Sequence, residues 1–307
     1  MAIAKKWDVL ALGVTSVDDL LYVAEFPAAN AKTRVLSSDR QCGGLSATAL
    51  VAASRLGACC AFAGALGENA LSQFVESTLV LEGIDTNFVT RRDDASPVHA
   101  TIVVDTSTGT RNIFAEHKGF TGADAFQPDD SIICATRVLF VDHHGIEGTI
   151  RAAKIARENC IPVVADFERL SAPRFSELMD LVDHLILSSD FACHLTGQET
   201  PERAARSLWT DRRAVVVITC GESGCWVLSS EMSQPQHFPA FAVEIVDTTG
   251  CGDVFHGAYA GTLAQGMDLE NRIRVASAAA ALKATQPGGQ KGIPLHEELE
   301  EFLSTQT

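Results

Sequence analysis

The chain has 307 residues, of which 46% are hydrophobic and 21% charged, a balance that is ordinary for a globular protein with a large buried core. Its formal net charge of -15 at pH 7 argues against a nucleic-acid-binding protein, because such proteins normally carry a basic face. We expect neither a signal peptide nor a membrane-spanning segment, since the first residues run into a strand-like segment and no apolar run is long enough.

From the amino terminus, segments typical of buried strands alternate with segments typical of helices. Strand-like segments lie at 7–15, 59–67, 137–145, 161–167, 184–190 and 214–221, and helix-like segments at 43–58, 69–84, 147–160, 200–209, 269–285 and 295–303. This alternation predicts an α/β protein whose mostly parallel central sheet is covered by helices. Length alone allows one large domain or two smaller ones.

Two segments interrupt this alternation, at about 19–40 and 97–117. Both alternate apolar and polar residues around turns, and the second has the composition of a hairpin with its turn at "TSTGT". They predict a small antiparallel sheet that projects from the main layer. Such a sheet is either a surface decoration or a lid over the carboxyl ends of the parallel strands, where ligands of these folds bind.

The nine cysteines give no sign of a disulfide framework. Their number is odd, no C-x-x-C pair occurs, and most lie in apolar surroundings. This pattern favours free thiols in a reducing compartment, and we expect a cytoplasmic protein.

The stretch "DTTGCGDVFHGAYAG", residues 247–261, combines a glycine-rich loop with the start of a helix. Gly250 and Gly252 allow backbone N–H groups to converge, and a helix amino terminus favours negative charge, so the stretch predicts an anion site. Asp253 lies in the first helical turn. An acid there stabilises its helix, but beside a bound phosphate it can also accept a proton from an attacking hydroxyl group.

Polar or glycine-rich residues follow other strands as well. Asp18 in "GVTSVDD" can bind sugar hydroxyls, and Gly43 and Gly44 in "QCGGLSAT" permit close approach by a ligand. The turn "TCGESG", with Thr219, Gly221 and Gly224, suits the phosphates or ribose of a nucleotide. Each signal is weak alone, because glycines after strands are common in turns, but their recurrence at strand ends favours one ligand-binding crevice.

These residues carry a family resemblance. "DTTGCGD" resembles the D-T-x-G-A-G-D signature of the ribokinase-like (PfkB) sugar kinases, with Cys251 in place of alanine, and "GGLSATALVAASRLGA" resembles their amino-terminal Gly-Gly signature. The resemblance implies a three-layer α/β/α ribokinase-like fold with a mostly parallel central sheet and a small β-sheet lid. It also implies a single domain over residues 1–307, and phosphorylation of a sugar hydroxyl by ATP with Mg²⁺.

The resemblance also implies roles for single residues. Asp253 would be the catalytic base, and the amides from Gly250 through Cys251 and Gly252 to Asp253 would form the anion hole. Asp18, Gly43 and Gly44 would bind the sugar, and Thr219, Gly221 and Gly224 the nucleotide. Asp247 matches an acid that orders the loop, in many relatives with a monovalent cation such as K⁺.

The chain departs from the family pattern at several positions. Thr48 stands where many relatives have asparagine in the sugar pocket. The N-x-x-E motif, which is linked to magnesium and phosphate, falls on "SSDF", with Ser188 and Phe191 at its two ends.

Within the family, the 43–58 segment, "IVDTTGCGDVFHGA" and "AALKATQPGGQKGIP" most resemble sulfofructose kinases. Lys32 matches a sulfonate-facing lysine there, whereas His144 and Ala115 replace other anion-facing residues. Three substrate classes therefore stay open: a ketose, a pentose or an anionic sugar.

Other interpretations remain open. Asp142, His143 and His144 in "VDHHG" could ligate a metal ion, as in manganese-dependent phosphoesterases, or could be a polar strand end in which a histidine contacts the sugar. The chain could also be a non-catalytic sugar- or nucleotide-binding module. Exposed edges of the lid strands suggest a homodimer formed through the lid.

Overall fold

The computed structural model describes residues 4–108, 110–170 and 173–306. Its main sheet has eight strands in the order β14-β13-β12-β11-β10-β9-β1-β4. Their bounds are β1 Trp7–Leu12, β4 Cys60–Phe62, β9 Thr136–Asp142, β10 Val163–Asp166, β11 His184–Ser188, β12 Val215–Thr219, β13 Cys225–Ser229 and β14 Gln236–Phe238.

In the main sheet, β4, β1, β9, β10, β11 and β12 are parallel to their neighbours. β13 and β14 are antiparallel additions at one edge. Only the short 3₁₀ turn Gly221–Ser223 joins β12 to β13, and so short a connection can form a hairpin but not a crossover.

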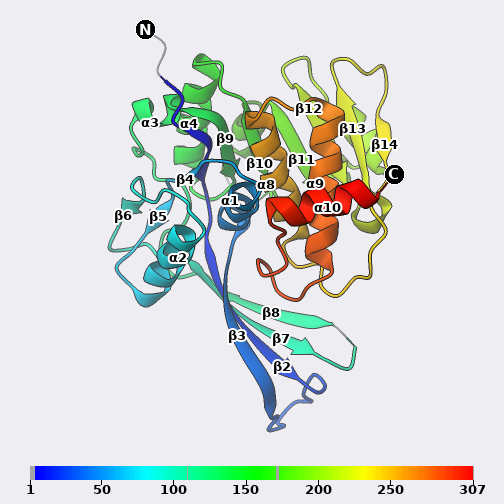
Figure 1. Ribbon diagram of the computed structural model, residues 1–307. Coiled ribbons are helices and arrows are strands. Elements are labelled where there is room, and N and C mark those ends of the chain that lie inside the picture. Colours follow the sequence, from blue (N-terminus) through cyan, green and yellow to red (C-terminus); the bar gives the residue numbers. More distant parts are fainter. Residues whose placement is uncertain (1–3, 109, 171–172, 307) are drawn as a thin grey trace.

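Helices cover both faces of this sheet, which gives three layers (Figure 1). Successive residues of β1 alternate between the faces, with Val9 and Ala11 in one core and Leu10 and Leu12 in the other. The first core is completed by α1 Leu45–Arg55, α2 Ala70–Leu81, α8 Cys251–Ala264, α9 Leu269–Ala284 and α10 His296–Thr305. The second is completed by α3 Asp130–Cys134, α4 Ile146–Glu158, α5 Phe175–Met179, α6 Ser189–Thr196 and α7 Pro201–Leu208. The predicted α/β architecture is therefore observed.

A second sheet projects from the main body (Figure 1). It contains β3 Val35–Gly43, β2 Ser16–Val23, β7 Val98–Asp105 and β8 Arg111–Glu116, in that order. The expectation of a purely antiparallel sheet is wrong, because β2 and β7 are parallel. The chain between β3 and β7 passes through α1, β4, β5 Ala65–Leu66, α2 and β6 Thr90–Arg91, a crossover long enough to return in the parallel direction.

The predicted segment 59–67 also differs in detail, since it divides into β4 and β5, and β5 pairs with β6 in a separate two-stranded sheet. Among the helices in the described ranges, none is both long and apolar enough to cross a membrane.

Candidate active site

The carboxyl ends of the parallel strands gather the candidate residues on one edge of the main sheet. Asp142 ends β9 and Asp166 ends β10, and the two are direct partners in the sheet register. Ser188 and Thr219 end β11 and β12 and are likewise partners. This is the edge at which open α/β sheets bind their ligands.

Helix α8 begins beside this edge with a left-handed residue. Gly250 has φ 77°, and a Cβ atom there would lie 2.8 Å from the carbonyl oxygen of Gly289, so glycine is required. At Gly252 an added Cβ atom would meet nothing within 4 Å, which leaves the helix start open. The N–H group of Cys251 donates to the carbonyl of Thr248 at 3.2 Å, so the first amide of the expected anion hole already has a partner. The amides of Gly252 and Asp253 precede the first intrahelical bond and have no backbone acceptor in the described ranges, so they can bind an anion.

Asp253 stands in the first turn of α8 next to a second carboxyl group, Asp166. Asp166 is only 5% exposed, and the two carboxyl groups are close enough to hydrogen-bond to one another. Burial raises the pKa of both groups well above the ordinary value. The negative charge of Asp166 raises the pKa of Asp253 further, whereas the charges of Glu168 and Asp142 raise that of Asp166 and its hydrogen bond with Asp253 opposes the shift. The pair can hold a proton at a pH where an isolated aspartate would not.

His256 joins this pair to the sheet. Its Nδ1 atom lies 2.8 Å from the carbonyl oxygen of Gly252 and 3.3 Å from Oδ2 of Asp166, and its Nε2 atom lies 3.0 Å from the carbonyl oxygen of Ile186. Burial lowers the pKa of His256, although the two carbonyl oxygens oppose that shift. The imidazole therefore fixes the first turn of α8 against β10 and β11.

On the lid side, Asp18 and Gly43 lie close together. A Cβ atom on Gly43 would approach Oδ2 of Asp18 to 2.5 Å, so only glycine leaves room for this carboxylate. The hydroxyl of Ser16 donates to Oδ1 of Asp18 at 3.0 Å, while burial raises the pKa of Asp18. The charge of Asp18 also raises the pKa of Asp253. The structure thus brings Asp18, which is expected to bind the sugar, and Asp253, the expected base, into one region.

Three other residues expected at the sugar lie differently. Gly44 precedes α1, with its φ of 94°, and packs on the backbone of Thr15. Thr48 is 1% exposed, and its hydroxyl accepts a hydrogen bond from Gln290 at 3.3 Å. Lys32 is exposed in the loop before β3, and the nine residues of β3, about 30 Å of extended chain, separate it from Gly44. Within one chain, Lys32 therefore lies far from Asp18, Gly43 and Gly44.

The residues expected at the nucleotide surround the ends of β11 and β12. The hydroxyl of Ser188 accepts from the Phe191 N–H and caps α6, and Phe191 is buried in the core, so neither end of "SSDF" offers a carboxylate. The hydroxyl of Thr219 donates to the Leu187 carbonyl at 3.4 Å. Gly221 is exposed, whereas Gly224 packs so tightly on β14 that an added Cβ atom would lie 2.0 Å from the carbonyl oxygen of Phe238. Packing and its φ of 87° both require glycine at position 224.

The loop at Asp247 does not fit an additional monovalent cation. Its carboxylate accepts from the N–H and hydroxyl of Thr249 and from the N–H of Gly288. Its carbonyl oxygen accepts from Nζ of Lys283 at 2.7 Å, and the Lys283 side chain is fully buried. The ammonium group already supplies a positive charge here, and a second cation beside it would be repelled.

The hypothesis of a metal site at "VDHHG" is not supported by the contacts of Asp142. Its Oδ2 atom accepts from the Val14 N–H at 2.7 Å and from the Ser46 hydroxyl at 2.9 Å, and its Oδ1 atom accepts from the His144 N–H at 2.8 Å. This carboxylate fixes the loops at the end of the sheet. In the ranges that the structure covers, no group of three or more His, Cys, Asp or Glu side chains is arranged to hold a metal ion.

The ribokinase-like fold and an open helix start beside a carboxylate define the class, a phosphotransferase. The chain belongs to the pfkB family of carbohydrate kinases, whose profile matches residues 7–295, and it is therefore a carbohydrate kinase. The ribokinase of Haemophilus influenzae is 30% identical to it, over 85% of this chain and 87% of that protein.

Two solved structures add to this comparison. A ribokinase candidate from Agrobacterium tumefaciens superimposes with a TM-score of 0.87 at 27% identity, over 98% of each chain. Arabidopsis thaliana ribokinase, complexed with ribose and ATP, superimposes with a TM-score of 0.82 at 22% identity, over 97% of this chain and 98% of that one.

Sequence reasoning missed Asp166, His256 and Lys283. Asp166 ends a buried parallel strand just as Asp142 does, so its position at the strand end was a usable signal. Lys283 is the only charged residue in the alanine-rich second half of α9, residues 275–284, which suggests a specific partner. His256 left no comparable signal, because its contacts depend on the packing of α8 on the sheet.

Proposed function

We propose that the protein transfers the γ-phosphoryl group of ATP to a hydroxyl group of a sugar, with Asp253 as the base. The observation that carries the proposal is the start of α8, where open amides and a carboxyl group of raised pKa share one helical turn. The family membership and the ATP complexes of structural relatives support it.

In the proposed reaction the sugar hydroxyl gives its proton to Asp253, its oxygen bonds to the γ-phosphorus, and the bond to the β-phosphate oxygen breaks to release ADP. The amides of Gly252 and Asp253 would stabilise the charge on the transferring phosphoryl oxygens. Mg²⁺ bound with ATP neutralises phosphate charge. Carboxylates suit this ion, and those of Asp166 and Glu168, near Asp253, would hold it.

The division of the crevice supports a sugar on the lid side and the nucleotide on the other side. Asp18, Gly43 and Gly44 would contact the sugar, with Thr48 behind them. Thr219, Gly221 and Ser188 would contact the nucleotide at the ends of β11 and β12. Segments 19–40 and 97–117 would cover the sugar as a lid of the single domain 1–307.

Two accessory proposals accompany this function. The apolar side chains of Val35, Leu36, Ile113 and Phe114 are exposed on lid strands, which supports a homodimer through the lid, and light scattering gives the mass that decides this. All nine cysteines are free thiols, which supports a reducing compartment, the cytoplasm.

The substitution Asp253→Asn tests the proposal. We expect kcat to fall by about 10²–10⁴-fold, the usual contribution of a general base, while the Kd for ATP changes little. Turnover is measured from ADP release together with mass spectrometry of the sugar product, and ATP binding by calorimetry. Asp211→Asn, at an exposed acid before β12, is the matched control.

The outcomes separate the alternatives. Near-normal phosphorylation by the Asp253→Asn variant would show that Asp253 is not the base. A wild-type protein that binds ATP and sugar without turnover would be a binding module, and phosphate release without ATP would indicate a phosphoesterase.

A further inference from the structure

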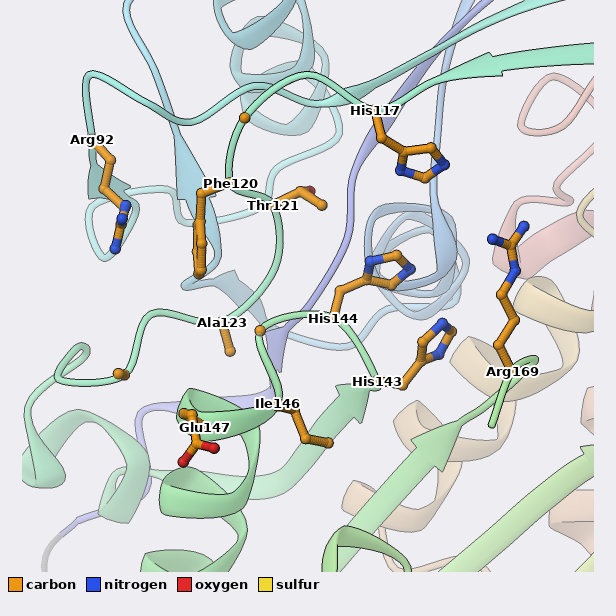
Figure 2. A pocket seen from close by; sticks show the side chains of 13 residues that line it. Arg92, His117, Phe120, Thr121, Ala123, His143, His144, Ile146, Glu147 and Arg169 are labelled. Carbon is orange, nitrogen blue, oxygen red and sulfur yellow. The ribbon is translucent and has the colours of Figure 1, made fainter. Parts of the chain in front are cut away.

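A pocket of about 640 Å³ opens at the loops that follow β9 and β10, the strands that end at Asp142 and Asp166. Its walls come from the loop after β8, the loop after β9 and the loop after β10. Figure 2 shows that His117, His143, His144 and Arg169 gather on one side of it, whereas Arg92 and Phe120 lie on the other. We call the first four residues the nitrogen cluster.

His143 is a buried polar group without a partner. Its side chain belongs to a residue that is 6% exposed, and within the described part of the chain neither ring nitrogen has a hydrogen-bond partner. The ring packs against that of His144, with centroids 4.4 Å apart. Leaving such a group unsatisfied is costly, so a buried imidazole that lines a pocket in this state indicates that a ligand supplies the missing contacts.

Among the charged residues that line the pocket, Arg169 is the one without an ion-pair partner in the described ranges. Glu147 pairs with Arg174, and Arg92 pairs with Asp94 and Asp124, so these charges are already balanced. Arg169 is exposed, and in the ranges that the structure covers no carboxylate lies within ion-pair distance of it. In a chain with a net charge of -15, a cluster of this kind is a local site for an anion.

We propose that the nitrogen cluster binds an anionic substituent of the sugar, a carboxylate, phosphate or sulfonate group, so that the substrate is an acidic sugar. Arg169 supplies charge and paired N–H donors, and the imidazole of His143 supplies a hydrogen bond that no other group of the described chain takes up. Lys32, at the tip of the lid, is not required. This inference rests on the proposed sugar kinase function and names its substrate class.

The test is a panel of sugars in matched sets, in which each neutral ketose or aldose is compared with counterparts whose terminal carbon carries a carboxylate, a phosphate or a sulfonate. We expect kcat/KM to be at least tenfold higher for one acidic member than for its neutral counterpart. The three acidic arms then show which oxyanion the cluster prefers.

The variants Arg169→Met and His143→Phe connect that preference to the cluster. Each is expected to reduce the ratio of kcat/KM between the acidic sugar and its neutral counterpart toward one, mainly through KM for the sugar. Arg212→Met and His296→Phe, at exposed positions away from the pocket, are the matched controls and should keep the wild-type ratio.

The failures are distinguishable. Neutral sugars that are phosphorylated as efficiently as acidic ones overturn this inference and leave the kinase function intact. A rise in KM for ATP alone in the Arg169→Met variant assigns that side chain to the nucleotide and also overturns it. No phosphorylation of any sugar in the panel contradicts the proposed function itself.

Discussion

Asp253, the proposed base, has a raised pKa because it is buried next to a second carboxyl group, that of Asp166. Burial has the largest effect on the pKa of Asp253, and the charge of Asp166 comes next. A base works only when unprotonated, so kcat/KM must fall as the pH drops through that raised pKa. The acid limb of the pH profile should therefore lie above the range of an ordinary aspartate.

Asp166→Asn tests this coupling. The amide keeps the size of the side chain but removes the negative charge, so the pKa of Asp253 should fall and the acid limb of kcat/KM should move to lower pH. The position of the limb is informative even if the rate itself falls. Glu168→Gln, which removes a more exposed charge, should move the limb less. A limb that stays in place in the Asp166→Asn variant would exclude the coupling.

Lys283 gives a second prediction at this scale. Since its ammonium group already contacts the Asp247 carbonyl, activity and thermal unfolding temperature should be the same in K⁺ and Na⁺ salts. Lys283→Met should lower kcat/KM at least tenfold, with partial recovery in K⁺ or ammonium. Lys118→Met, at an exposed lysine, serves as control. Activation of the wild-type enzyme by K⁺, or a K⁺-dependent rise in its unfolding temperature, would contradict the prediction.

At the scale of elements, the parallel strands were predictable because each is a short apolar run buried on both faces. The start of α8 was predictable too, since Gly250 and Gly252 break the apolar pattern just where a helix begins. The parallel pairing of β2 with β7 was not, because strand direction depends on a long crossover and local alternation carries no record of it.

The site shows the same division. Asp253 and Asp18 stand in recognisable stretches, and the structure brings them together. Asp166 and His256 matter through contacts across the sheet and α8, which are set by register and packing. Lys32 illustrates the reverse case, since a family match alone did not reveal that β3 holds it far from the crevice.

At the scale of the whole molecule, a buried polar network links strand β11 of the main sheet to helices α8 and α9. Tyr259 of α8 is fully buried, and its hydroxyl accepts from Nη1 of Arg272 at 3.1 Å and lies 2.9 Å from Nδ1 of His184. The hydroxyl has one proton of its own, which it can donate to an unprotonated Nδ1 of a neutral His184. Burial lowers the pKa of His184 to about 3.

This network predicts how stability depends on pH. The unfolded chain protonates His184 below its ordinary pKa of 6.5, whereas the folded protein does so only near 3, so stability falls as the pH drops through that window. The His184→Gln variant cannot take up this proton, so its free energy of unfolding should decrease less on acidification than that of the wild type. The difference between the two should amount to about 1.4 kcal/mol for each pH unit well below pH 6.5. The variant should unfold at a lower temperature than the wild type at pH 7.5, and the gap should narrow by pH 5, as followed by circular dichroism. His296→Gln, at an exposed histidine, should show no such narrowing. If the difference in unfolding temperature between the His184→Gln variant and the wild type is the same at both pH values, His184 is not held neutral in the folded protein. The contact between β11 and α8 would then need another description.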